Sequence, residues 1–543
     1  VYTSKSGDHI DLTRTAGAGT VTFTLSDASL EFATGNVHLA DNVDLSVGTG
    51  TGNLTVLGVA GTSYEDVTLT TSGTLTIGTG GIGGTTEIQT VNLDGNSIVL
   101  KGNITTAATG EGAGDVGDVD FDGAVTIDGD ITISTNVDGT GNDGKIDFAT
   151  NTITAAASGT NELTLTSGAG TTTIDGAIGG STALDALEIN TTALDINANI
   201  TTADGLIDIN APVTLTGASV ISSGTGGGNV DFSSTITGAQ NLDILSGTGN
   251  VIITGNIGAT ALTSLDINQS GGSGNVTLSG NIGAHAASGA GIVRIGNNSM
   301  TGTLTFGGAD YNTTGDQTYI ADYYVMSGTD PEFKTDNDKI RFEDGGITLA
   351  AGADLLLKSG GTNTAGDILV EGAITGTDDS GAGVINVTME AGTGSVSVAG
   401  MGTDIGAVTL DGGGGITLNG NITTVASNID IDDATTLATG AIVLTTANGS
   451  VDFASTIDGG QDLTIRSGTG AVGLNGVVGG STTLGALTIN ATSDSQTGNG
   501  AITIVDIGDS NTVGAGATNI GNTATNSITL KGSTFKHGAA VYT

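Results

Sequence analysis

Residues 451–490 read VDFASTIDGGQDLTIRSGTGAVGLNGVVGGSTTLGALTIN, and this pattern recurs in the chain. A near-copy occupies residues 230–268, VDFSSTITGAQNLDILSGTGNVIITGNIGATALTSLDIN, and a looser copy runs from 146 to 190 and ends IDGAIGGSTALDALEIN. A longer period overlies the short one, since NITT at 199–202 returns at 421–424. Repetition of this kind indicates an array of similar units rather than a set of globular domains.

The repeats alternate apolar and polar residues over short segments, such as VTFTL at 21–25 and VTLTT at 67–71. This period of two is typical of a strand with one buried face. Gly, Asn, Asp and Ser separate the segments, as tight corners require. No segment shows the sustained periodicity of about 3.6 residues that is typical of an α-helix. We therefore predict an all-β fold, a single long parallel β-solenoid with almost no α-helix, in which each coil pairs with its neighbours.

Composition favours a solenoid over collagen or a disordered chain. The 543 residues include 95 Gly but only 2 Pro, no Cys and no Trp. The glycines lack the every-third spacing of collagen. Mean hydropathy is +0.17, and a disordered chain would have fewer apolar residues to bury. Asn190, Asn268 and Asn490 end corresponding segments, so we expect stacked amides or hydroxyls at these positions.

The repeat at 451–490 resembles the repeats of giant filamentous-haemagglutinin-like bacterial surface exoproteins. GDQTYIADYYV at 315–325 is similar to a recurring block of the same proteins, and the resemblance covers roughly residues 90–530. It implies a right-handed β-helix, secretion to an extracellular or bacterial cell-surface location, and an adhesive or structural role.

The repeat pattern is less regular in some parts of the chain than in others, which predicts five segments. Residues 315–325 fall in an aromatic-rich part that includes Tyr319, Tyr323 and Tyr324, followed by DPEFKTDNDKIRFEDGG at 330–346. We interpret this part as an extension that leaves the coil and carries an assembly or ligand contact, or alternatively as a junction whose aromatics fill the core. The segments are an N-terminal end segment (1–20), solenoid repeats (21–300), the aromatic-rich extension or junction (301–346), solenoid repeats (347–526) and a basic C-terminal tail (527–543).

The tail contrasts in charge with the rest of the chain. The formal net charge is −44, which repels nucleic acid and anionic membranes, whereas the tail has Lys531 and Lys536 and no acidic residue. We expect the tail, with Phe535 and Tyr542, to dock on an acidic neighbouring copy and continue its sheet. The predicted partner is thus another copy of the chain in a head-to-tail homopolymer.

One acidic stretch resembles the start of a calcium loop. DVDFDG at 118–123 places Asp118, Asp120 and Asp122 at alternate positions, although Gly129 stands where the loop needs an acid. Either these carboxylates bind Ca²⁺, or they form a solvated acidic face. GTGNDGKID at 139–147 is a weaker calcium candidate. No other cofactor is expected.

Catalysis has little support in the sequence. There is no G-x-S-x-G, and the G-x-G-x-x-G matches at 78–83 and 112–117 are expected by chance among so many glycines. With 12 basic residues and no Trp, a polysaccharide-cleaving groove is not expected either. No run of 18 apolar residues predicts a membrane span. Because the chain starts at Val1, we expect a processed chain or a piece of a longer one.

We therefore expect a structural extracellular protein, a β-solenoid subunit that assembles end to end into a surface fibre or sheath, and not an enzyme. The alternative is an adhesin stalk or passenger segment that binds surface glycans or a protein of a host or other cell. Microscopy of the purified chain discriminates the two, because only the first forms fibres.

Overall fold

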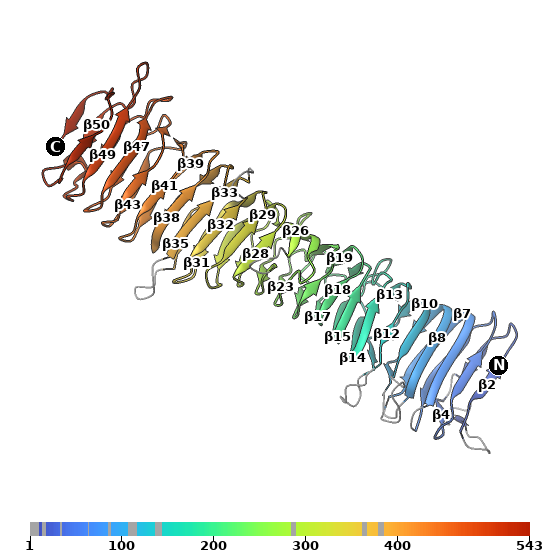
Figure 1. Cartoon of the computed structure of the whole chain (residues 1–543). Coiled ribbons are helices and arrows are strands. Elements are labelled where there is room, and N and C mark those ends of the chain that lie inside the picture. The colour runs from blue at the N-terminus through green and yellow to red at the C-terminus, as the bar shows by residue number, and fades with distance from the viewer. Residues whose placement is uncertain are drawn as a thin grey trace. The chain divides into compact units, whose positions relative to one another are not determined.

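The computed structural model describes residues 10–12, 18–32, 35–62, 65–84, 88–106, 117–135, 144–283, 289–360, 366–377 and 385–543. These residues form a parallel β-solenoid of about 21 turns, so the predicted all-β solenoid is confirmed (Figure 1). Among them the one helical element is a 3-10 turn, η1 (Thr492–Asp494). Residues 1–9 and 13–17 of the expected end segment, residues 112–116 of one glycine motif, and residues 139–143 of the weaker calcium candidate lie outside the described part.

The chain divides into two compact units, Val1–Gly274 and Asn275–Thr543, called unit 1 and unit 2 below. Most coils contribute three strand segments, some of them joined into one longer strand, and these pair in parallel with the segments of the next coil. In unit 1, for example, Ile207 lies beside Val230 and Val213 beside Ile236. This spacing means that one coil takes about 23 residues, within the range of solenoid repeats.

The strands of unit 1 follow in chain order: β1 (Ile10–Leu12), β2 (Val21–Thr24), β3 (Leu30–Phe32), β4 (Val37–Leu39), β5 (Leu45–Gly48), β6 (Leu54–Ala60), β7 (Glu65–Ile82), β8 (Ile88–Leu100), β9 (Ile104–Thr105), β10 (Val119–Ile127), β11 (Ile131–Ser134), β12 (Ile146–Asp147), β13 (Ile153–Ala155), β14 (Glu162–Ile174), β15 (Ala186–Ile196), β16 (Ile200–Thr201), β17 (Ile207–Asn210), β18 (Val213–Leu215), β19 (Ser219–Ser222), β20 (Val230–Phe232), β21 (Ile236–Thr237), β22 (Asn241–Leu245), β23 (Val251–Ile253) and β24 (Leu262–Ile267).

The strands of unit 2 form three stacks. Stack A contains β25 (Val276–Leu278), β27 (Thr303–Phe306), the second halves of β29 (Gln317–Met326) and β31 (Ile340–Leu349), β34 (Ile374–Gly376), β37 (Met401–Gly402), β40 (Ile422–Thr424), β43 (Ile442–Thr446), β46 (Leu463–Arg466), β48 (Leu487–Ile489), β50 (Thr518–Ile520) and β52 (Ala540–Tyr542).

Stack B contains β28 (Asp310–Thr313), β30 (Glu332–Thr335), β32 (Leu355–Ser359), β35 (Ile385–Glu390), β38 (Ile405–Asp411), β41 (Ile429–Ile431), β44 (Val451–Phe453), the first parts of β47 (Val472–Val478) and β49 (Ile502–Ile507), and β51 (Ile528–Leu530). Stack C contains β26 (Ala290–Gly296), the first halves of β29 and β31, β33 (Ile368–Val370), β36 (Val396–Val398), β39 (Ile416–Leu418), β42 (Thr435–Leu437), β45 (Ile457–Asp458) and the last parts of β47 and β49.

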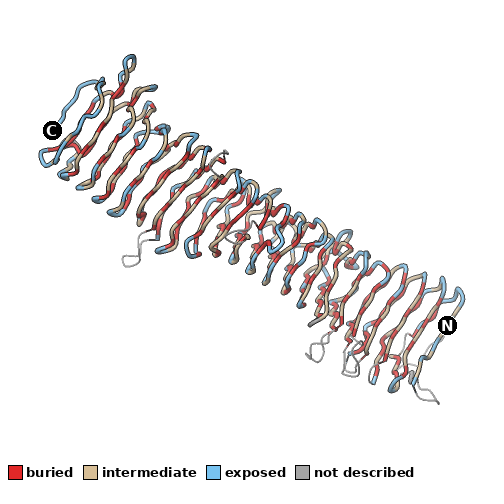
Figure 2. The backbone as a smooth tube through the Cα atoms, viewed as in Figure 1, coloured by how far each residue is buried: buried red, intermediate tan, exposed pale blue. Residues whose placement is uncertain are grey.

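The core of each unit is a narrow column of Val, Ile and Leu side chains. Along each strand, buried and partly exposed residues alternate, and Figure 2 shows the buried positions recurring from coil to coil. In the repeat that defines the fold, Ile457, Leu463, Ile465 and Leu474 are fully buried. The alternation read from the sequence thus corresponds to one side chain inward and the next outward.

A hydrogen-bonded latch closes the SGTG corner in both units. Ser467 Oγ donates to the Gly470 carbonyl at 2.8 Å, and Ser246 Oγ donates to the Gly249 carbonyl at 2.8 Å. The Asn one coil later holds each serine, because Asn490 and Asn268 both bond to the serine N–H and hydroxyl. The amides of these two Asn residues thus bond to a serine hydroxyl one coil earlier, whereas Asn190 contacts another amide and accepts a 3.1 Å bond from Asn210.

Of the two interpretations of residues 301–346, an extension that leaves the coil is wrong, and aromatics that fill the core agree with the structure. Residues 330–346 contain β30 and most of β31, which pair in register with the strands of neighbouring coils. All aromatics of this part except Tyr323 point inward, and they form one fully buried cluster of Phe306, Tyr311, Tyr319, Tyr324, Phe333 and Phe342. Parallel register places equivalent side chains about 4.8 Å apart, so rings on successive coils stack. Tyr311 stacks on Phe333 with 4.7 Å between ring centres, and Tyr319 stacks on Phe342 at 4.9 Å.

Candidate assembly interface

The last described coil of unit 2 consists of β51, the bridge at Phe535 and β52. Leu530, Phe535 and Tyr542 align with Ile504, Ile507 and Ile520 of the preceding strands, which are core residues. The three residues therefore occupy core positions of their own coil.

These core positions are nevertheless open to solvent. Leu530 is 45% exposed and Tyr542 is 38% exposed, and the outward-facing Val541 reaches 55%. The cause is that the described residues place no further coil against this one: β51 pairs with β49, and β52 pairs with β50. The coil thus presents an apolar surface of the kind that elsewhere in the unit is covered by the next coil.

The backbone of β52 also has unused hydrogen-bonding groups. Thr518 N–H donates to the Ala539 carbonyl and Thr543 N–H donates to the Ile520 carbonyl, both at 2.9 Å. Alternate residues of a parallel strand bond to opposite neighbours, so Ala540 and Tyr542 direct their N–H and C=O groups away from β50. Among the described residues no strand pairs with that edge. An uncovered edge of this kind is a template for another strand.

The same coil is basic. Lys531 is exposed, Lys536 Nζ donates to the Ser510 carbonyl at 2.5 Å, and the His537 Nε2 lies 2.9 Å from the Tyr542 hydroxyl. Burial raises the pKa of Tyr542, so its hydroxyl stays protonated at neutral pH. The predicted contacts Lys531, Lys536 and Tyr542 are therefore brought together on one accessible coil, with Phe535 partly buried between them.

The first described coils of unit 1 have the opposite charge. Asp27, Glu31 and Asp41 are exposed there, and Asp44 is partly exposed. The described part of these coils holds no lysine or arginine up to the end of β5. Acidic coils at one part of the chain and a basic coil at another are complementary surfaces for two copies.

The tyrosines predicted as contacts separate into two classes. Tyr319 and Tyr324 are fully buried in the aromatic cluster, and the Tyr324 hydroxyl donates to the Tyr319 carbonyl at 2.8 Å. Burial also raises the pKa of Tyr324. Their assignment to an assembly contact is wrong, because neither ring reaches the surface. Tyr323 is 64% exposed and remains available.

The predicted calcium ligands lie around the start of β10. Asp120 and Asp122 point outward. Lys145 Nζ forms ion pairs with Asp120 Oδ1 at 2.9 Å and with Asp147 Oδ2 at 3.2 Å. Burial, together with the nearby Asp120 and Asp147 carboxylates, raises the pKa of Asp118. The positive charge beside these carboxylates is thus the ammonium group of Lys145. No cluster of three or more His, Cys, Asp or Glu side chains suited to a metal occurs in the described residues.

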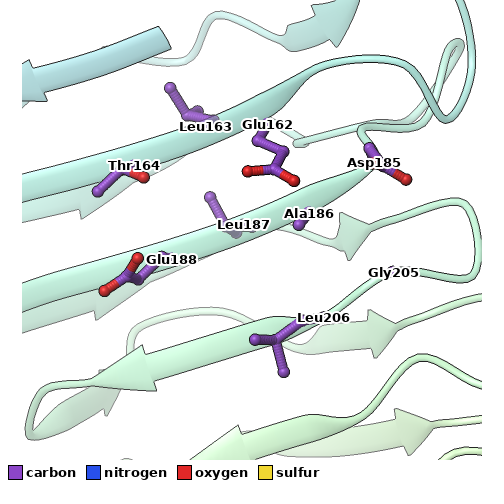
Figure 3. A pocket seen from close by; sticks show the side chains of 9 residues that line it. All are labelled: Glu162, Leu163, Thr164, Asp185, Ala186, Leu187, Glu188, Gly205 and Leu206. Carbon is purple, nitrogen blue, oxygen red and sulfur yellow. The ribbon is translucent and has the colours of Figure 1, made fainter. Parts of the chain in front are cut away.

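A hollow on unit 1 gave no signal in the sequence. It measures about 310 Å³ and is lined by Glu162, Asp185, Glu188 and Leu206, among others. Figure 3 shows Glu162 on β14, Glu188 on β15 and Asp185 just before the start of β15. Glu188 accepts a 2.8 Å bond from the amide of Asn190. Asp185 and Glu188 belong to one coil and Glu162 to the coil before it, so the register between β14 and β15 brings Glu162 to the other two.

Comparison of the chain with family models, with curated proteins and with solved structures gave no match. The resemblance to filamentous-haemagglutinin-like proteins is therefore supported at the level of a β-solenoid repeat arrangement alone. Within the described part of the chain, no helix has the length and hydropathy needed to cross a membrane.

Proposed function

We propose that this chain is a structural, extracellular subunit that assembles end to end into a bacterial surface fibre or sheath. The observation that supports the proposal is the last described coil, where core positions, strand edges and basic charge are all exposed together. A second copy would place its acidic first coils against this exposed coil. Such a contact uses two different surfaces and does not close, so it propagates into a filament.

Each part of the contact has a separate physical role. Stacking a coil on Leu530, Val541 and Tyr542 removes apolar area from water, which gives affinity. Pairing along the free edge of β52 fixes the register of the incoming strand, as in strand addition. Lys531 and Lys536 steer the acidic coils of the other copy, and this contribution weakens with salt because surface charges are screened over about 8 Å at physiological ionic strength.

The experiment that tests the proposal removes one backbone donor. Ala540→Pro deletes an outward N–H of β52 and leaves the Val541 N–H that bonds to β50. Ala540→Ser is the matched control, since it keeps the donor. We expect fibres in negative-stain micrographs of the unmodified chain and of Ala540→Ser, and none with Ala540→Pro. A chain lacking residues 527–543 should also fail to form fibres.

The charge component has its own test. Lys531→Glu combined with Lys536→Glu should slow fibre growth in low salt and have less effect in high salt, followed by light scattering. The proposal is wrong if fibres persist in the Pro and deletion variants, or if the unmodified chain stays monomeric at high concentration. Monomeric protein that binds surface glycans would instead support an adhesin stalk.

A further inference from the structure

The chain contains a chemically reactive pair of residues, asparagine followed by glycine, at four places in unit 2. In such a pair the glycine nitrogen can attack the asparagine side-chain carbonyl and close a five-membered succinimide ring, because glycine has no side chain to obstruct the approach. The folded structure decides which pair reacts, since it either holds the reacting groups in hydrogen bonds or leaves them free. The four pairs are Asn419–Gly420, Asn448–Gly449, Asn475–Gly476 and Asn499–Gly500.

Asn448 lies at an exposed corner just before β44, and the next coil holds its side-chain oxygen. Thr469 provides both donors, since its N–H donates to Asn448 Oδ1 at 3.1 Å and its hydroxyl donates to the same oxygen at 3.0 Å. Two donors aimed at one carbonyl oxygen stabilise the negative charge that develops there when a nucleophile adds, as in an oxyanion hole. The side-chain carbonyl of Asn448 is therefore activated toward attack.

The two nitrogen atoms that take part in the reaction are not engaged elsewhere. Within the part of the chain that the structure describes, neither Asn448 Nδ2 nor the Gly449 N–H has a hydrogen-bond partner. The side-chain nitrogen can thus leave as ammonia, and the glycine nitrogen can act as the nucleophile. Because Asn448 is exposed, water reaches the ring that forms.

The other three pairs lack this combination of an activated carbonyl and free nitrogens. The Nδ2 groups of Asn475 and Asn419 each donate to a side chain of the preceding coil, at 2.9 and 3.0 Å, so both leaving groups are anchored. The N–H of Gly500 donates to the Gly468 carbonyl at 3.3 Å, so the nucleophile of the fourth pair is engaged. The structure therefore favours reaction at Asn448.

We propose that Asn448–Gly449 is a self-modifying site, at which Asn448 is converted to aspartate or isoaspartate without an enzyme. The Gly449 nitrogen forms a bond to Asn448 Cγ while Thr469 holds Oδ1. The bond between Cγ and Nδ2 then breaks, and ammonia leaves with the proton of the former Gly449 N–H. Water adds to the succinimide and opens the ring at one of its two carbonyls, which gives either aspartate or isoaspartate.

A corner of unit 1 shows that the aspartate product fits. The corner TGTG at 49–52 matches SGTG at 467–470, and there Asp27 takes the place of the asparagine. Asp27 Oδ1 accepts the Thr51 N–H at 3.3 Å and the Thr51 hydroxyl at 2.9 Å, so a carboxylate forms the same two bonds. Aspartate at position 448 thus adds a negative charge and keeps the coil. Isoaspartate lengthens the main chain by one carbon and disturbs the register of β44 with β41.

Peptide mapping by mass spectrometry measures the reaction in the full chain. The protein is incubated at mildly alkaline pH in heavy-oxygen water, which labels each newly formed carboxyl group. In the folded chain we expect Asn448 to be converted at least about tenfold faster than Asn419 and Asn475. In urea the four rates should become similar, because the pairs then share the same chemistry and no longer have different surroundings.

Thr469→Val tests the role of the donor hydroxyl. It should slow the conversion of Asn448 about tenfold in the folded chain and leave the rate in urea unchanged, because one donor to the developing oxyanion is lost. Thr464→Val, an outward position on β46, is the matched control and should change neither rate, and circular dichroism confirms that both variants fold. Equal rates at the four pairs in the folded chain would overturn the proposal, as would a Thr469→Val chain that reacts as fast as the unmodified one.

Discussion

The latch at the SGTG corner predicts the effect of replacing one buried amide. Asn490 Oδ1 accepts the Ser467 N–H at 2.8 Å, and its Nδ2 donates to Ser467 Oγ at 2.8 Å. Asn490 is 1% exposed and has φ 46°, a left-handed conformation that Asn tolerates better than Ala. Asn490→Ala therefore removes two hydrogen bonds and places a strained residue at a corner that the next coil covers.

The magnitude follows from two contributions. The Ser467 N–H would be left buried without an acceptor, which costs about 1–3 kcal/mol. The left-handed conformation costs Ala about 1–2 kcal/mol. We therefore expect Asn490→Ala to lower the free energy of unfolding by about 2–5 kcal/mol. Asn490→Gly loses the bonds without the strain, so its loss should be about 1–3 kcal/mol.

Urea-induced unfolding measures these differences. A long solenoid does not always unfold in one step, so the transition of unit 2 needs its own signal. Near-ultraviolet circular dichroism provides one, because the buried Tyr311, Tyr319 and Tyr324 belong to that unit and the chain has no Trp. A loss below about 1 kcal/mol for Asn490→Ala would refute the hydrogen-bond argument. Equal losses for the Ala and Gly variants would refute the conformational one.

Three further predictions concern the coils themselves. Gly123→Ala should lower the melting temperature far more than Gly129→Ala; both residues have positive φ, but the new Cβ would lie 1.7 Å from a carbonyl oxygen at Gly123 and 3.8 Å from the nearest oxygen at Gly129. Tyr324→Phe should lower the free energy of unfolding in urea by about 1–3 kcal/mol, because the buried Ala321 N–H loses its acceptor, whereas Tyr323→Phe should have little effect. The pKa of Asp430 is raised above 3.8 by burial and neighbouring carboxylates, so its ionised form destabilises the fold at neutral pH, and this cost disappears as pH falls toward 3.8. Asp430→Asn should therefore raise the melting temperature at pH 7, with a gain that shrinks toward pH 4; an equal gain at both values would contradict the cause.

The candidate site was only partly predictable. The basic charge of Lys531 and Lys536 is visible in the sequence, because it depends on composition alone. The exposure of Leu530 and Tyr542 is not, since both occupy positions that are buried in every equivalent coil of unit 2. Charge could be read from residue types, whereas exposure depends on which strand lies above.

The sequence by itself determined the parallel solenoid, because alternation, glycine-rich corners and the repeat length are local properties that each coil carries. The inward or outward direction of neighbouring tyrosines was decided by tertiary structure. In QTYIADYYVM the corner at Asp322 interrupts the alternation, so both Asp322 and Tyr323 face outward and Tyr324 faces the core. Pairing with β31 fixes that register. The latch between Ser467 and Asn490 has the same origin, since its two residues lie 23 positions apart in the chain and meet only after coiling.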